Sequence, residues 1–149
     1  MAFDAPSLKG RALRLLGTRE YSRLELQRKL AQYEEEPGSL AAALDDLQAK
    51  GFISEQRVLE SVVHRRASKL GALRIKQELK SKGLPADIVA AAVADLQGSE
   101  LTRAQAIWRK RFVVEATEPK ERARQARFLA ARGFAGNVIR RVIGGGDLS

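Results

Sequence analysis

Residues 79–84 read LKSKGL, and fifty residues further on residues 129–134 read LAARGF. In both stretches a glycine follows a segment of helix-forming residues, and an apolar residue comes directly after the glycine. Glycine readily adopts the left-handed backbone that often ends a helix, and the apolar residue after it can pack against the last turn. We therefore predict that a helix ends just before Gly83 and another just before Gly133.

The likeness between these stretches belongs to a longer repeat with a period of about 50 residues. At an offset of 49, Leu26, Leu30, Leu40, Leu44 and Leu47 recur as Ile75, Leu79, Val89, Val93 and Leu96. A further step of 50 leads from Leu79, Gly83, Ile88, Val89 and Val93 to Leu129, Gly133, Val138, Ile139 and Ile143. Each repeat is predicted to open with a longer helix, at residues 8–16, 54–70 and 102–112, and to continue with two shorter helices.

The fold class follows from this periodicity. Apolar residues recur at spacings of three and four, and no stretch shows the alternation typical of a strand. We predict an all-α protein made of three tandem three-helix repeats, at residues 1–53, 54–101 and 102–149, the last with a flexible Gly-rich tail. A unit of about 50 residues is only marginally stable alone, because it buries little surface, so the units should stack into an elongated, curved array.

Two local signals support these helix boundaries. Ser22 can cap the second helix, with Glu25 at the spacing of a capping box, and Ser54 can cap the fourth. The turn at residues 34–38 places acids before the third helix, where the positive end of its dipole favours them.

The charge points to an anionic partner. The chain has 149 residues, with 27 Lys and Arg against 18 Asp and Glu, so the net charge is +9. Residues 1–50 are balanced, residues 51–100 carry +2, and residues 101–149 carry +7. A polyanion, or a partner coated with one, would be attracted to such a chain. The alternative is an ordinary solvated helical surface, because Arg and Lys are good helix formers.

Several classes of chemistry are excluded. The chain has no Cys and a single His, His64, which removes disulfide frameworks, thiolate metal sites and most His-based catalysis. It contains no phosphate-binding glycine motif and no apolar stretch of about 18 residues. The adjacent acids at residues 34–36 and 45–46 are expected to be solvated. We therefore predict a cytoplasmic protein that is not an enzyme and needs no cofactor or metal.

The basic residues are the candidate binding site. Lys120, Arg124 and Arg127 are spaced at i, i+4 and i+7, so they share one face of a helix. Three like charges on one face repel each other, and an anionic partner would offset that cost. The predicted partner-facing residues are Lys76, Lys80, Arg109, Lys110, Arg111, Lys120, Arg124, Arg127, Arg132, Arg140 and Arg141.

Some of these residues have a simpler explanation. Residues 109–111 close a helix, where cations are favoured by the helix dipole in any case. Glu78 is expected to pair with Arg74 and Lys82, which leaves Lys76 and Lys80 for a partner. Trp108 has the spacing of a core residue, and stacking on nucleic acid is its alternative role.

With these motifs the chain resembles the RecX family, bacterial regulators of the RecA recombinase. The likeness runs from Ala12 to Ile143 and rests on the blocks ALRLL (12–16), REYSR (19–23), KGFISE (50–55), GALRIKQELKSKGL (71–84), RKRF (109–112), ARFL (126–129) and RGF (132–134). Two positions depart from the family pattern: the turn at 34–38 is more acidic, and Val58 stands where an aromatic residue is more typical. Both are expected to be surface or packing changes.

The resemblance implies a fold and a function. Family members are all-helical arrays of three-helix units that bind the RecA filament along its groove. They lower its ATPase, strand-exchange and coprotease activities, which tunes recombination and the SOS response, and they have no catalytic site. The expected partner is thus the RecA nucleoprotein filament. The protein is expected to bind it as a monomer, with its cations reaching the phosphates of single- or double-stranded DNA. The alternatives are direct DNA binding without RecA, and a scaffold for an unrelated acidic protein.

Overall fold

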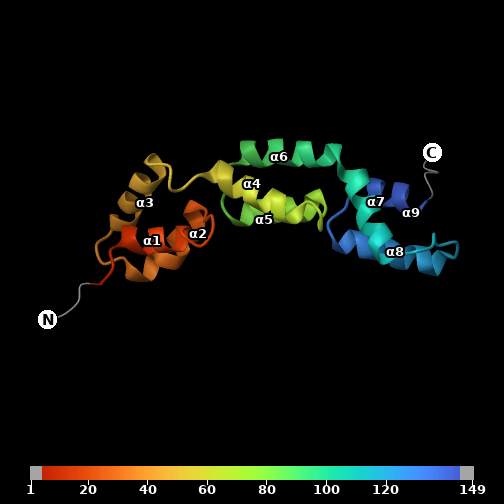
Figure 1. The fold of residues 1–149 in the computed structure, drawn as a ribbon, viewed down its shortest axis with the longest axis horizontal. Coiled ribbons are helices and arrows are strands. Elements are labelled where there is room, and N and C mark those ends of the chain that lie inside the picture. The colour runs from red at the N-terminus through yellow and green to blue at the C-terminus, as the bar shows by residue number, and fades with distance from the viewer. Residues whose placement is uncertain (1–4, 145–149) are drawn as a thin grey trace.

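The computed structural model describes residues 5–144, and all regular elements within that range are helical (Figure 1). The helices are α1 (Leu8–Leu16), α2 (Arg23–Leu30), a short 3-10 helix η1 (Ala31–Tyr33), α3 (Ser39–Ala49), α4 (Glu55–Arg66), α5 (Ala72–Ser81), α6 (Ala86–Gly98), α7 (Glu100–Arg111), α8 (Pro119–Ala131) and α9 (Gly136–Ile143). Figure 1 shows three groups of three helices that follow one another in an arch, with α5 on the concave side and α6 on the convex side of the middle group. This confirms the predicted all-α array of three-helix repeats.

Each group of helices has its own hydrophobic core. The buried side chains at the centres of these cores include Ala12, Leu26 and Leu44 in the first, Val62, Ile75 and Leu79 in the second, and Ala104, Leu129 and Phe134 in the third. The apolar positions that defined the repeat therefore point inward. The unit boundaries at 53/54 and 101/102 stay a prediction, and the predicted Gly-rich tail at 145–149 lies outside the described residues.

The helix ends follow the local chemistry of the sequence. Ser22 and Glu25 form the predicted capping box, and the Ser54 hydroxyl accepts a hydrogen bond from the amide of Arg57. Gly83 and Gly133 have φ angles of 72° and 93°, as predicted for glycines that end helices.

Two predicted helix boundaries are wrong. The helix predicted at residues 54–70 ends at Arg66, because the chain then turns toward α5 and the Leu70 amide donates to the Arg66 carbonyl. The helix predicted to begin at residue 102 begins at Glu100, since α6 ends at Gly98 and the chain bends only at Ser99 before turning helical again.

The second helices of the three groups, α2, α5 and α8, meet end to end. The end of α5 lies against the start of α2, where Gly83 packs on Leu24, and the end of α8 lies against the start of α5, where Gly133 packs on Arg74. We call this arrangement the helix row. Gly83 and Gly133 occupy equivalent positions of the repeat, so each junction places the glycine that ends one helix against the start of the corresponding helix in the preceding unit.

The junction between α8 and α5 is made by backbone atoms. The amide of Gly71 donates to the Arg132 carbonyl at 2.7 Å, and the amide of Leu73 donates to the Gly133 carbonyl at 3.1 Å. The first amides of a helix have no partner within the helix. Here the chain that leaves α8 supplies the acceptors, so the third unit completes a helix of the second.

A buried ion pair reinforces this junction. The carboxylate of Glu100, only 4% exposed, accepts hydrogen bonds from the amide of Ala72 at 3.1 Å and from Arg103 at 2.6 Å. Arg103 also donates to the carbonyls of Ala67 and Leu70, at 2.9 and 2.8 Å. A buried charge is tolerated when it is paired and hydrogen-bonded, and these contacts meet both conditions.

The junction between α5 and α2 depends on side chains instead. Within residues 5–144 no backbone hydrogen bond joins the first and second units. Lys82 donates to Glu25 at 3.1 Å, and Arg57 pairs with Glu20 at 2.9 Å. Burial raises the pKa of Glu25, but the Ser22 amide, Arg19 and Lys82 together outweigh it and lower that pKa to about 2.

Substitution of Gly71 by Ala tests the backbone junction. A Cβ atom there would lie 2.3 Å from the Gly133 carbonyl oxygen, which cannot swing away as a side chain would. We expect Gly71→Ala to lower the free energy of unfolding by about 1–3 kcal/mol, as overpacking typically does. The control is Gly98→Ala, where nothing lies within 4 Å of the new Cβ and where the change should stabilise by up to about 1 kcal/mol. Equal urea midpoints for the two variants would show that the close backbone contact at Gly71 does not contribute to stability.

Substitution of Glu25 by Gln tests the side-chain junction through pH. The folded-state pKa of Glu25 lies below the usual value of 4.5, so the stabilisation from its charge is complete above about pH 4.5. It is lost as the pH falls toward about 2. The difference in urea midpoint between wild type and Glu25→Gln should therefore shrink over that range. A difference that is independent of pH would show that the carboxylate is not held in its charged form.

Candidate basic binding surface

The predicted partner-facing residues are mostly unpaired cations at the surface. They lie on α5 (Lys76, Lys80), at the end of α7 (Arg109, Lys110, Arg111), along and just after α8 (Lys120, Arg124, Arg127, Arg132) and on α9 (Arg140, Arg141). Within residues 5–144 only Arg124 among them pairs with a carboxylate, that of Glu121 at 2.7 Å. The other charges remain available to an external anion.

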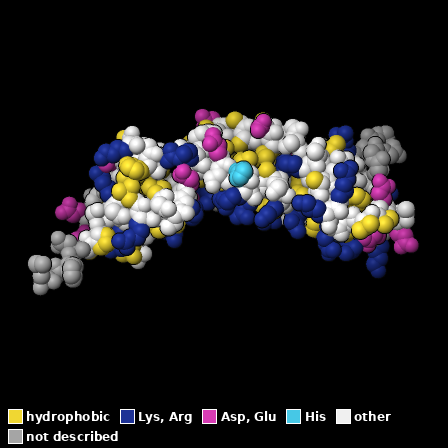
Figure 2. Space-filling model, in the orientation of Figure 1, with side chains coloured by type: hydrophobic (Ala, Val, Ile, Leu, Met, Phe, Trp, Pro, Cys, Tyr) yellow, Lys and Arg dark blue, Asp and Glu magenta, His cyan; other side chains and the backbone are white. Residues whose placement is uncertain are grey.

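The concave side of the arch carries the densest part of this charge. Figure 2 shows Lys and Arg side chains gathered along the concave edge below the middle unit, where Figure 1 places α5. On α5, Lys80 is exposed and Lys76 is half-buried. Because α5 is the middle member of the helix row, its cations lie between those of α2 and α8.

A surface depression of about 480 Å³ lies where the second and third units meet. Four cations line it: Arg66, Lys69, Arg74 and Arg132. Only the last was predicted as a site residue. The others were missed because they come from the end of α4, the following loop and α5, and only the junction brings them together.

Glu78, which also lines this depression, does not have its predicted partners. Its carboxylate accepts a hydrogen bond from Arg66 at 3.0 Å. The predicted pairing with Arg74 and Lys82 is wrong, because both cations are used at the junctions: Arg74 donates to the Ala131 carbonyl at 2.7 Å, and Lys82 pairs with Glu25. Arg74 and Lys82 thus form contacts between units instead of ion pairs with Glu78 in their own unit.

In the third unit, cations collect around a pair of aromatic rings. Phe112 and Phe128 pack edge to face with ring centres 5.3 Å apart. The guanidinium groups of Arg111 and Arg124 lie 5.5 and 5.4 Å from the Phe112 ring, and that of Arg132 lies 4.8 Å from the Phe128 ring. A ring face attracts a cation without neutralising it. The rings therefore position three predicted residues, and Arg111 and Arg132 keep a charge that no carboxylate within residues 5–144 neutralises.

Trp108 is a partly buried residue at the edge of this unit's core. It packs against the third hydrophobic cluster, and its indole N–H donates to Gln125 at 2.9 Å. Gln125 is itself buried, so the indole edge is held inside the unit.

The remaining predicted cations of the third unit are exposed. Lys120 and Arg127 are exposed on α8, and Arg140 and Arg141 are exposed on α9.

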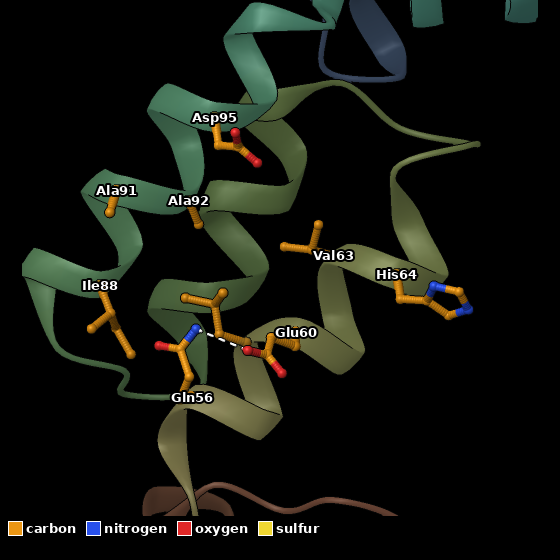
Figure 3. A pocket seen from close by; sticks show the side chains of 9 residues that line it. Gln56, Glu60, Val63, His64, Ile88, Ala91, Ala92 and Asp95 are labelled. Carbon is orange, nitrogen blue, oxygen red and sulfur yellow. Dashed lines mark hydrogen bonds between the residues drawn. The ribbon is translucent and has the colours of Figure 1, made fainter.

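The face of the middle unit between α4 and α6 has a different character. A groove of about 510 Å³ lies between α4 and α6, with apolar side chains such as Ile88 and Ala92 along it (Figure 3). Gln56 donates to Glu60 at 3.2 Å. His64 also lines the groove and forms no side-chain hydrogen bond within residues 5–144. Among the described residues no group of three or more His, Cys, Asp or Glu could hold a metal ion. None of the described helices is long and apolar enough to cross a membrane.

Comparison with known proteins gives consistent matches over the chain. Residues 54–93 match the family model described as RecX, second three-helix domain, and residues 99–143 match RecX, third three-helix domain. The chain is 52% identical over 145 residues to the regulatory protein RecX of Leptothrix cholodnii, covering 96% of this chain and 92% of that protein. It is 48% identical over 141 residues to the regulatory protein RecX of Ralstonia nicotianae, covering 95% and 89%.

Solved structures show the same fold. The crystal structure of RecX from Lactobacillus salivarius superposes with a TM-score of 0.78 at 20% identity, covering 95% of this chain and 96% of that one. A second crystal structure, of a regulatory protein RecX, superposes with a TM-score of 0.77 at 19% identity, covering 93% of this chain and 71% of that one. The three-unit array is therefore preserved at low sequence identity.

Proposed function

Because the chain belongs to the RecX family of regulatory proteins, we propose that it binds the RecA–DNA filament and lowers the ATPase, strand-exchange and coprotease activities of RecA. The observation that carries this proposal is an arch with unpaired cations along its concave side. A filament of protein wound on DNA is long, helically grooved and anionic at its DNA. A curved, basic array is complementary to such a groove in both shape and charge.

The helix row gives the array the length that this binding needs. Cations of α5 and α8 are carried on two helices joined by backbone hydrogen bonds, so their spacing is held. If this protein spans two or more RecA protomers, the fixed spacing of its cations favours binding, because less conformational freedom is lost when it binds. The predicted partner-facing residues would then reach the DNA phosphates or acidic RecA side chains.

Inhibition requires that binding differ between filament states. RecA protomers must move relative to one another during ATP turnover and strand exchange. A rigid bridge across protomers would favour one arrangement over the others and so hinder the cycle. If the protein had equal affinity for all filament states, it would not change their relative populations, however tightly it bound.

The direct test is a titration of the purified protein into RecA, single-stranded DNA and ATP. We expect ATP hydrolysis and strand exchange to fall as the protein approaches stoichiometric amounts. Unchanged rates at that point would refute the proposal. Under the alternative, the protein would instead bind naked duplex DNA tightly at physiological salt and have no effect specific to RecA.

The C-terminal face is tested by a charge-reversal variant. Lys120, Arg124 and Arg127 are exposed on α8, so changing all three to Glu should leave the helicity nearly intact. Filament affinity should fall by at least about tenfold, since three contacts at roughly 0.5–1 kcal/mol each exceed the 1.4 kcal/mol of one decade. The control keeps the charges (Lys120→Arg, Arg124→Lys, Arg127→Lys) and should keep the affinity. Wild-type affinity in the Glu variant would remove α8 from the binding surface.

A further inference from the structure

The first unit contains a basic pocket that no predicted site residue belongs to. It has a volume of about 320 Å³ and lies between α1 and the end of α2. Four cations line it: Arg11, Arg14, Arg28 and Lys29. Leu15, Leu30, Gln32 and Tyr33 complete the wall, and no acidic residue takes part. We call it the N-terminal pocket.

These four cations are not neutralised by the protein. Within residues 5–144 none of them forms an ion pair, although residues 1–50 hold as many acids as bases. Four of the acids in this segment pair elsewhere: Asp46 with Lys9 and Lys50, Asp45 with Arg23, Glu25 with Arg19 and Lys82, and Glu20 with Arg57. Because these acids are used on other cations and none lines the pocket, the four cations of the pocket keep their positive charge.

The pocket lies at the open end of the helix row. The ends of α5 and α8 are covered by the preceding unit, at Gly83 and Gly133. No described residue covers the end of α2 in this way. Arg14 and Arg28 are in the last turns of α1 and α2, where the negative ends of the helix dipoles favour them. These helix ends therefore stabilise the cluster of like charges.

An aromatic ring supplies the second half of the site. The Arg11 guanidinium lies 3.7 Å from the centre of the Tyr33 ring, and Tyr33 remains 41% exposed. Cations beside an exposed aromatic ring are the combination with which proteins hold single-stranded nucleic acid, the cations on phosphates and the ring on a base. An acidic peptide would use the charges but would have no use for the ring.

We propose that the N-terminal pocket binds single-stranded nucleic acid, with phosphates on Arg14, Arg28 and Lys29 and a base stacked against Tyr33. This site goes beyond the function proposed above, because it needs no RecA. It also places a nucleic-acid contact at the end of the array opposite the strongly basic third unit.

The test measures binding of labelled oligothymidylate of about six nucleotides, near the lower end of single-strand site sizes, by fluorescence anisotropy without RecA. Arg14→Ala/Arg28→Ala should weaken binding about tenfold and reduce the salt slope by about 1.4, for two lost phosphate contacts. The matched control is Arg65→Ala/Arg122→Ala, which also removes two exposed charges that form no ion pair within residues 5–144. It should change the affinity by less than about twofold.

A second comparison isolates the ring. Tyr33→Leu should weaken binding of the oligothymidylate but not of an abasic oligomer with the same phosphates, because only the base can stack. Equal losses in the two double variants would show unspecific attraction and overturn the proposal. So would an unchanged affinity of Tyr33→Leu together with equal competition by polyglutamate, which would identify an acidic peptide as the ligand. Since RecA is absent, neither result bears on the filament proposal.

Discussion

The array depends on the contact between the end of α8 and the start of α5. Two backbone amides there donate to carbonyls of the next unit, and the backbones approach so closely that a side chain at Gly71 would overlap Gly133. A backbone contact of this kind leaves little freedom in distance or angle. The direction of the third unit, and with it the position of most of the positive charge, is set at this junction.

The fold could be predicted because its signals are local. Gly83 and Gly133 mark helix ends through a conformation that other residues adopt only with strain, and the capping box at Ser22 needs only residues three apart. The repeat then extends these local signals over the chain. What could not be predicted is what the units do to each other: Glu78 is paired with Arg66 because its expected partners are taken at the junctions.

The basic character of the candidate site could be predicted from the sequence, but the arrangement of its cations in space could not. Counting charges identifies the basic last third and the exposed face of α8, because these properties belong to single helices. Arg66, Lys69 and Arg74 gather in one depression only through a junction, and the N-terminal pocket is hidden in a segment whose overall charge is zero. A net charge averages over faces, so it cannot reveal how acids and bases are separated in space.

The capping of α5 has a consequence for how the protein is made. The acceptors for the first amides of α5 lie far downstream, on Glu100, Arg132 and Gly133, whereas α2 is capped by its own Ser22. As the chain leaves the ribosome, the capping box of α2 can form as soon as Ser22 and Glu25 have emerged, because both partners are local. The start of α5 lacks its hydrogen-bond acceptors until Arg132 and Gly133 have been synthesised. Chaperones that bind nascent chains would therefore find the middle unit incompletely folded for longer than the capped helix α2 of the first unit.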